Sequence, residues 1–347
     1  MHIKEVAKQL NTTPRTIRFY EEKGLITPRK EAGNEYHTFT DKDMLRLSTI
    51  LALREVGMPI NVIKGVLDNP DMGMNDYLNV QRSSLFEKWT EIRDMLHTID
   101  QMIEKTSDDT DLNETIFALA RHLKSMKDLR KNWEDKWNFD DQAAGYDQNI
   151  KMAGYWFNVH QDYDKALSKA AETLLQPNDV CVDIGVGTGN LGAKFLEKNV
   201  RVVGVDQSEE MLKVCAEKHP EIETRKGHFL ALPLFDNQAD AIVSSYALHH
   251  IPDDEKLLAL EEMSRVLKDK GQICIVDLMF LDEKHRSDMI SHFEENGNHD
   301  AIDAIKDEFY ADQSKLTEWL TSTGYHVETH EFNDILSMIY AKRKTLS

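Results

Sequence analysis

The chain has 347 residues, of which 41% are hydrophobic and 30% are charged, and its formal net charge is −19. This length and composition suffice for two or three packed domains and exclude a collagen-like or wholly disordered chain. No signal peptide, lipidation motif or apolar run of about 18 residues is visible, so we expect a cytoplasmic protein without a membrane span. The three cysteines, Cys181, Cys215 and Cys274, are expected to be buried free thiols in a reducing compartment.

The first forty residues predict a winged helix-turn-helix. Residues 3–10 have the apolar spacing of one helix face and end in a tight turn at Asn11. Thr13 and Pro14 are a capping pair for a second helix that runs to Glu22. Residue types able to contact base edges and phosphates lie on this second helix and on the expected two-stranded wing: Arg15, Thr16, Arg18, Tyr20, Arg29 and Tyr36.

Charge also sets this head apart from the remainder of the chain. The first thirty residues carry seven basic and three acidic side chains, whereas the whole chain is strongly acidic. Only the head is therefore suited to hold DNA phosphates.

The segment MHIKEVAKQLNTTPRTIRFYEEKGLITPRKEAGNEYHTFT closely resembles the head of MerR-family transcription regulators. The similarity continues through DKDMLRLSTILALREVGMPINVIKGVLDNP, a helix pair with its turn at Gly57 to Pro59. It implies a dimer that binds a pseudo-palindrome in double-stranded promoter DNA and distorts it. His37 stands where the family usually has an arginine after the wing tyrosine, which places one phosphate contact in question.

A heptad pattern of apolar residues runs from Leu78 to Ile103 and predicts a coiled-coil helix. Two series of positions, offset by four, make up the seam: Leu78, Leu85, Ile92 and Ile99, and Trp89, Leu96 and Ile103. The MerR resemblance implies that this helix pairs antiparallel across a homodimer; the alternative is a helix packed within its own chain. Metal-sensing relatives carry cysteines at its end, and this chain has none there, so no metal is expected.

The acidic segment Ser107 to Asn113 is expected to be a linker. Apolar residues from Ile116 to Trp137 then suggest an amphipathic connecting helix. Its aromatic end would dock on the following domain or cap its acceptor site. The expected organisation is a DNA-binding domain at 1–70, a dimerisation helix at 71–106, a linker and connecting helix at 107–140, and an α/β Rossmann-like domain at 141–347.

The segment VCVDIGVGTGNLG predicts a nucleotide-binding strand-turn-helix. A buried strand ends near Asp183, and Gly185, Gly187 and Gly189 let the backbone approach a ligand at the start of a helix. Asp206 ends the next strand, where a carboxylate can accept hydrogen bonds from both hydroxyl groups of a ribose. The glycine spacing alone also fits nicotinamide and flavin enzymes. Asp183 favours S-adenosylmethionine instead, because a carboxylate suits its amino group and would repel a pyrophosphate.

The order D-x-G-x-G-x-G followed by an acid, together with KGHFLALPLFDNQADAIVSSYALHHIPDDEKLLALEEMSRVLKDKGQICIVD, resembles class I methyltransferases. Similarity is greatest to small-molecule enzymes of the ubiquinone and menaquinone biosynthesis type. It implies a Rossmann-like α/β sheet and a bound S-adenosylmethionine held by Tyr146, Asp183, Gly185, Gly187, Gly189, Asp206, Gln207, His228, Phe229, Ser245 and Tyr246.

His228 is a departure, because the family usually has an acid there to receive the adenine amino group. A neutral imidazole nitrogen can accept that hydrogen bond, or the side chain can point to solvent. Methyl transfer needs mainly positioning and exclusion of water, with a base only when the acceptor carries a proton. His250 and Tyr146 are the candidate catalytic residues.

Together these features predict a cytoplasmic, dimeric MerR-type regulator with an S-adenosylmethionine-dependent methyltransferase domain that acts on a small molecule. The alternative is a regulator whose methyltransferase fold only senses S-adenosylmethionine or a metabolite, without turnover.

Overall fold

The computed structural model describes residues 1–30, 37–68, 74–105, 112–131, 137–152, 160–172 and 175–344. The chain folds as two compact units, Met1–Gln81 and Arg82–Ser347. Their boundary falls inside a single long helix, so the segment expected at 71–106 as a separate dimerisation element is shared between both units.

The first unit is helical with a small two-stranded sheet. Its elements are α1 (Ile3–Gln9), α2 (Pro14–Glu22), β1 (Arg29–Lys30), β2 (His37–Thr38), α3 (Asp41–Glu55) and α4 (Ile60–Asp68). The backbone N–H of Thr16 donates to Oγ1 of Thr13 at 3.1 Å, and Pro14 occupies the first helical turn, as predicted for α2. Strands β1 and β2 pair antiparallel and form the described part of the wing.

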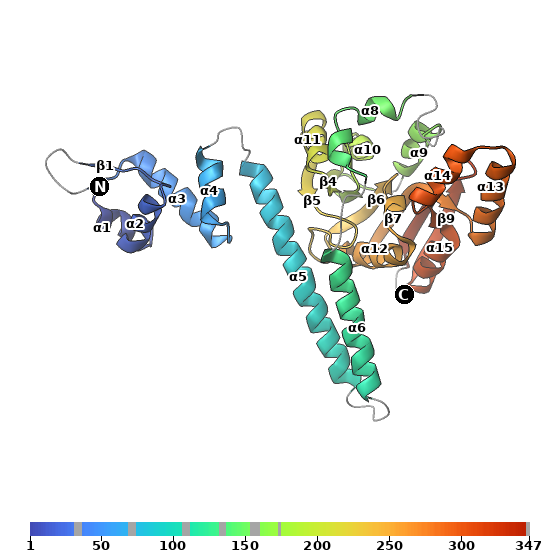
Figure 1. Ribbon diagram of the computed structural model, residues 1–347, viewed down its shortest axis with the longest axis horizontal. Coiled ribbons are helices and arrows are strands. Elements are labelled where there is room, and N and C mark those ends of the chain that lie inside the picture. The colour runs from blue at the N-terminus through green and yellow to red at the C-terminus, as the bar shows by residue number, and fades with distance from the viewer. Residues whose placement is uncertain are drawn as a thin grey trace. The chain divides into compact units, whose positions relative to one another are not determined.

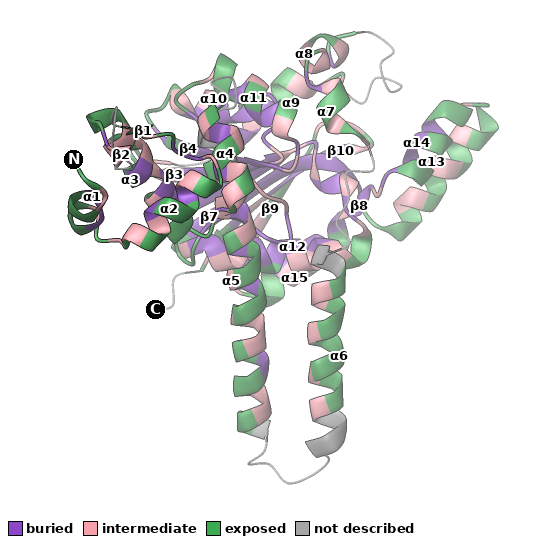
Figure 2. Cartoon of the chain, turned by 60° about the vertical axis from the view of Figure 1, so that its left-hand side comes forward, coloured by how far each residue is buried: buried purple, intermediate pink, exposed green. Residues whose placement is uncertain are grey.

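A helical hairpin leads into the second unit. The helices α5 (Met74–Lys105) and α6 (Leu112–Lys131) run antiparallel to each other (Figures 1 and 2). The expected linker falls on residues 106–111, which lie outside the described residues, and α6 already begins at Leu112. Three short helices follow: α7 (Phe139–Gln142), α8 (Tyr146–Asn149) and α9 (Tyr163–Ala170).

The second unit is built on a mixed eight-stranded sheet with the order β5-β4-β3-β6-β7-β10-β9 and β8 paired with β7. The strands are β3 (Val180–Ile184), β4 (Arg201–Asp206), β5 (Glu223–Lys226), β6 (Ala239–Ser245), β7 (Leu267–Phe280), β8 (Ala311–Asp312), β9 (Tyr325–Glu331) and β10 (Leu336–Arg343). The first five in this order are parallel, and β10 is antiparallel to both of its neighbours. Parallel strands covered on both faces are apolar throughout, which explains the nearly continuous burial of β3 and β4.

Helices cover both faces of this sheet (Figure 1). The helices are α10 (Asn190–Leu196), α11 (Glu209–Lys218), η2 (Leu248–His250, a 3₁₀ helix), α12 (Asp253–Val266), α13 (Glu283–Glu295), α14 (His299–Asp307) and α15 (Gln313–Ser322). One core layer contains residues of α9, α10 and α11, and the other contains residues of α12 and α15. The three cysteines are buried and free, as predicted. No helix among the described residues has the length and apolarity needed to cross a membrane.

Helix α5 has two different faces within the second unit. On one face the rings of Phe86 and Trp89 lie 4.8 and 5.7 Å from that of Phe235, and the Arg265 guanidinium lies 5.0 Å from the Trp89 ring. Trp89 therefore packs within its own chain, and its predicted place in the dimer seam is wrong because Phe235 and Arg265 already cover it.

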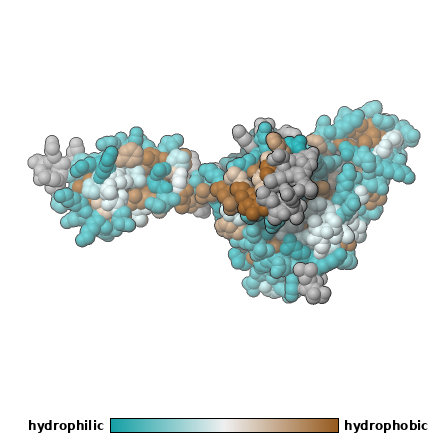
Figure 3. Space-filling model, turned by 90° about the horizontal axis from the view of Figure 1, so that it is seen from below, coloured by the Kyte–Doolittle hydropathy of each residue, from teal (hydrophilic) through white to brown (hydrophobic). Residues whose placement is uncertain are grey.

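The other heptad residues of α5 are exposed, from 39% to 64% of their surface: Leu78, Leu85, Ile92, Leu96, Ile99 and Ile103. Figure 3 shows hydrophobic side chains on the surface over α5 beside the end of the hairpin. Pairing of this exposed stripe across a homodimer stays a prediction.

Candidate functional site

The glycine turn lies between β3 and α10, and its three glycines have different roles. Gly185, Gly187 and Gly189 have φ of 70°, 51° and 90°, in the left-handed region that favours glycine. A Cβ on Gly185 would lie 2.3 Å from Cβ of Ala247, and one on Gly189 would lie 2.9 Å from Sγ of Cys215. A Cβ on Gly187 would meet nothing within 4 Å. Gly187 therefore keeps space open for a ligand, whereas Gly189 permits close packing against α11.

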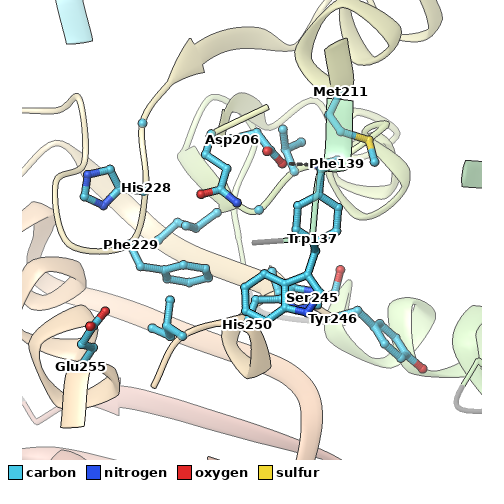
Figure 4. Close-up of a pocket in the computed structure, with 18 of the residues that line it drawn as sticks. Trp137, Phe139, Asp206, Met211, His228, Phe229, Ser245, Tyr246, His250 and Glu255 are labelled. Carbon is cyan, nitrogen blue, oxygen red and sulfur yellow. Dashed lines mark hydrogen bonds between the residues drawn. The ribbon is translucent and has the colours of Figure 1, made fainter. Parts of the chain in front are cut away.

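A cavity of about 470 Å³ opens above this turn, at the carboxyl ends of the parallel strands. This volume is within the usual range of small-molecule sites. Ten of the predicted site residues line it: Tyr146, Gly185, Gly187, Asp206, Gln207, His228, Phe229, Ser245, Tyr246 and His250. Figure 4 shows Asp206, Phe229, Trp137 and His250 arranged around the cavity.

Two predicted cofactor residues, Asp183 and Gly189, do not line the cavity. The Asp183 side chain is 1% exposed, and the backbone N–H of Gly192 donates to its carboxyl group. Burial, with the like charge of Asp206 adding to it, outweighs the lowering effect of this hydrogen bond and raises the pKa of Asp183 to about 8. The contact predicted between Asp183 and the cofactor's amino group stays a prediction, because the side chain lies behind the residues that line the cavity.

Asp206 lines the cavity at the end of β4, as predicted. Its Oδ2 accepts the backbone N–H of Gly187 at 2.8 Å, and its Oδ1 accepts that of Ser208 at 2.9 Å. These bonds fix the carboxylate against the glycine turn, at the edge of the cavity.

His228 belongs to the residues that line the cavity next to Phe229, but its imidazole ring is directed away from Phe229 and Asp206 (Figure 4). Its Nδ1 accepts the backbone N–H of Leu230 at 3.3 Å. In the neutral ring the proton then sits on Nε2, which makes this nitrogen a donor. The predicted hydrogen bond between His228 and the adenine amino group stays a prediction.

A cap of short helices covers one side of the cavity. Asp140 of α7 accepts from Oγ of Ser208 at 2.6 Å, and Asp147 of α8 accepts from Oγ1 of Thr188 at 2.6 Å and from Lys218. These bonds hold the Tyr146 segment against the glycine turn and α11.

The aromatic end of the connecting segment belongs to the same cap. The rings of Trp137 and Phe139 lie 4.6 and 4.9 Å from that of His250, and both line the cavity. Sequence analysis placed Trp137 as a docking aromatic or a cap. It did not identify Phe139, Asp140 or Asp147, although the acids near the AAGYD segment were a visible signal.

A smaller cavity of about 50 Å³ adjoins the first and shares Trp137, Phe139, Tyr146, Tyr246 and His250 with it. The Tyr246 ring stacks on that of His160 at 5.0 Å. In Figure 4 the Tyr246 ring is directed away from Phe229. This small cavity therefore continues from the aromatic side of the larger one.

The predicted catalytic residue His250 lines both cavities, while its neighbour His249 forms a short hydrogen bond with Asp277. Burial and the adjacent His249 hold the pKa of His250 well below its usual range, so it is neutral. Burial also opposes the charged form of His249, but Asp277, 2.5 Å from its Nδ1, and Glu308 outweigh burial and raise its pKa. Nothing in the sequence pointed to Glu308.

In the first unit, some of the residues predicted to contact DNA lie on the surface and one lies in the core. Arg15, Arg18 and Arg29 are exposed, and Thr16 is partly exposed. The Tyr20 ring is 5% exposed and packs in the hydrophobic core, so it supports the position of α2 and is not presented to DNA as predicted. Tyr36 lies outside the described residues. Nδ1 of His37 lies 2.9 Å from a Glu21 carboxylate oxygen, which ties the wing to α2.

Comparisons with known proteins agree with this division. Residues 1–70 match the MerR HTH family of regulatory proteins, and residues 181–271 match a methyltransferase domain. The chain is 30% identical over 216 residues to the uncharacterized methyltransferase YrrT of Halobacillus halophilus, covering 62% of this chain and 96% of that protein. An uncharacterized methyltransferase of Geobacillus thermodenitrificans is 31% identical over 219 residues, covering 63% and 97%.

The chain belongs to this methyltransferase family. Among solved structures, a methyltransferase of Haloferax volcanii in complex with the Trm112 activator has a TM-score of 0.47 and 20% identity, covering 61% of this chain and all of that one. The YcgJ protein of Bacillus subtilis has a TM-score of 0.42 and 19% identity, covering 52% and 99%. The methyl donor of the class I methyltransferase fold is S-adenosylmethionine, so the nicotinamide interpretation of the glycine turn is set aside.

The residues present fit this cofactor. The methyltransferase has a cavity of suitable volume, a glycine whose missing Cβ keeps it open, and an acid at the end of β4. The aromatic Phe229 adds an apolar wall for a base.

Proposed function

We propose that this chain is a MerR-type transcription regulator whose methyltransferase unit methylates a small molecule, and that it acts as a homodimer. One observation supports this proposal above all. A helix-turn-helix unit with exposed basic residues on α2 is joined to a unit with a glycine-lined cavity that continues into a small capped pocket.

For S-adenosylmethionine, Asp206 would hold the ribose, Phe229 and His228 the adenine, and Ser245 and Tyr246 the methionine end. The bound cofactor supplies a methyl group already activated by its sulfonium. The protein's own task is to orient the acceptor and to keep water out. Trp137, Phe139 and Tyr146 line this side of the cavity with aromatic rings and perform that exclusion.

Size and charge support a small molecule as the acceptor. The pocket beside the cofactor cavity holds about 50 Å³ and is walled by aromatic rings. Beyond the first thirty residues, 58 acidic side chains outnumber 35 basic ones, so this part of the chain repels a polynucleotide. A protein or nucleic-acid acceptor would need an open surface at this point.

An exposed apolar stripe on α5 supports the proposed dimer. Leu85, Ile92 and Ile99 repeat at seven-residue intervals and are 46%, 53% and 49% exposed. Such a stripe on one helix suits a coiled-coil partner. A second copy of the chain carries the same stripe, as an isologous contact requires.

Alanine substitutions at two matched glycines test the cofactor site, and calorimetric titration with S-adenosylmethionine measures their effect. Gly187 and Gly297 both have positive φ, and a Cβ at either meets nothing within 4 Å, but only Gly187 lines the cavity. Each alanine variant loses about 1–2 kcal/mol of stability through its left-handed backbone. We expect Gly187→Ala to weaken binding at least tenfold and Gly297→Ala to leave it unchanged. Equal affinities in both variants, or no binding by the unsubstituted chain, would refute the assigned site.

A further inference from the structure

Two histidines and a buried glutamate converge beside the acceptor pocket. His249 and His250 lie on η2 after β6, and Glu308 follows α14. One ligand atom from each of these three side chains lies within 4.8 Å of the others, and Nε2 of His249 is 3.9 Å from Oε2 of Glu308. All three line the cavity of about 50 Å³.

Asp277 on β7 fixes the orientation of His249. Its Oδ1 lies 2.5 Å from Nδ1 of His249, and its Oδ2 accepts the backbone N–H groups of Ala247 and Leu248 at 3.0 and 2.6 Å. An ionised carboxylate only accepts, so the proton of His249 sits on Nδ1. The Nε2 lone pair is then directed to the Glu308 side. A carboxylate behind one imidazole nitrogen is the usual support of a histidine that binds a metal through the other.

The charge balance of the cluster also calls for a cation. Asp277 and Glu308 are 0% and 8% exposed, and buried carboxylates are costly unless a positive charge lies beside them, either a protonated His249 or a metal ion that takes the place of its proton. The neighbouring Lys256 ammonium is directed elsewhere, to the carbonyl oxygens of Ile251 and Phe309 at 2.7 and 2.6 Å and to Asp253. His250 adds a buried Nδ1 that has no hydrogen-bond partner among the described residues.

We propose that His249, His250 and Glu308 form a binding site for a divalent first-row transition metal, with Asp277 as the residue that positions His249. Two imidazole nitrogens and one carboxylate suit ions of the Zn²⁺, Fe²⁺ and Co²⁺ type. Ligand atoms about 2.0–2.2 Å from an ion are about 3–4 Å apart, so small side-chain rotations close the widest pair. Three protein ligands leave a coordination position open to the acceptor pocket for water or an acceptor oxygen or sulfur.

Cobalt is the probe for this site, because its visible absorption reports binding without any activity. The full-length chain, dialysed against a chelator, is titrated with Co²⁺. We expect one site per chain with d–d bands and no thiolate charge-transfer band. Glu308→Gln and His249→Ala are expected to weaken Co²⁺ binding at least tenfold. Asp277→Asn is expected to weaken it about 10- to 100-fold.

His326→Ala is the matched control for adventitious binding by surface histidines, because His326 is exposed and lies 3.5 Å from Glu328. This variant should bind Co²⁺ as the unsubstituted chain does. Circular dichroism and S-adenosylmethionine titration verify that each variant is folded, and they separate a failure of the metal site from a failure of the cofactor site. An unsubstituted chain that binds no Co²⁺, or binding that survives in folded Glu308→Gln, would overturn the proposal.

Discussion

Asp183 shows how burial changes the meaning of a motif residue. Its position in D-x-G-x-G-x-G suggested a carboxylate facing the cofactor's amino group. The structure instead buries the side chain behind the glycine turn, where its pKa rises to about 8. Spacing identified the residue, but its charge state depends on packing that spacing does not show.

This raised pKa predicts a pH dependence of stability. Between the ordinary value of 3.8 and about 8, the folded state keeps a proton on Asp183 that the unfolded state has lost. Stability should therefore fall as pH rises through this window. Asp183→Asn, which is neutral throughout, should show a shallower decline. Urea unfolding of both proteins from pH 5 to 8 measures the difference, and parallel curves would show that the group is ionised in the fold.

Arg18 is the residue whose DNA role is most easily measured. Its side chain is exposed on α2. Arg18→Ala should weaken binding to the operator and reduce the slope of log affinity against log salt by about one, if it neutralises one phosphate. Arg201→Ala, which removes an exposed arginine from the methyltransferase unit, is the control. Fluorescence anisotropy with labelled operator DNA gives both slopes, and an unchanged slope for Arg18→Ala would argue against the contact.

At the scale of elements, the sequence predicted the helix α5 well. The predicted set of seam residues on its surface was wrong for Trp89. The seven-residue pattern identified the exposed stripe. Trp89 had the same spacing, but its ring packs with Phe235 and Arg265, more than 140 residues further along the chain. Periodicity reports which residues share a face, whereas a contact between distant segments depends on the tertiary fold.

The two faces of α5 make opposite predictions for substitution. Ile92→Glu combined with Ile99→Glu places charges on the exposed stripe and should convert the dimer to a monomer while the chain stays folded. Leu45→Glu is the control, because Leu45 is 72% exposed on α3. Trp89→Ala should leave the dimer intact and lower the thermal stability of the methyltransferase unit. Light scattering gives the masses, and a dimer that survives both glutamates would exclude this stripe as its interface.

The strands of the catalytic sheet followed the sequence closely, because buried parallel strands are apolar runs bounded by glycine or acid. The cap over the site was harder to predict. Asp140 and Asp147 have hydrogen-bond partners 68 and 41 residues away, and Glu308 reaches His249 from a loop after α14. No sequence pattern near any of these residues indicates its distant partner.

At the scale of the whole molecule, two independent sets of features occupy one chain. The MerR match ends at residue 70, the methyltransferase match begins at residue 181, and α5 contributes residues to both compact units. Charge divides the chain in the same way, because the head is basic and the remainder is acidic. The proposal of a regulator that carries its own methyltransferase rests on this division.

Methyl transfer to a small molecule is the central claim, and formation of S-adenosylhomocysteine tests it most directly. The full-length chain is incubated with S-adenosylmethionine and with separate low-mass, protein and nucleic-acid fractions of a cell extract, and the product is quantified by mass spectrometry. The account predicts S-adenosylhomocysteine with the low-mass fraction alone, at a rate that Gly187→Ala greatly reduces and Gly297→Ala preserves. Cofactor binding without any product, or product only with protein or nucleic acid, would contradict it.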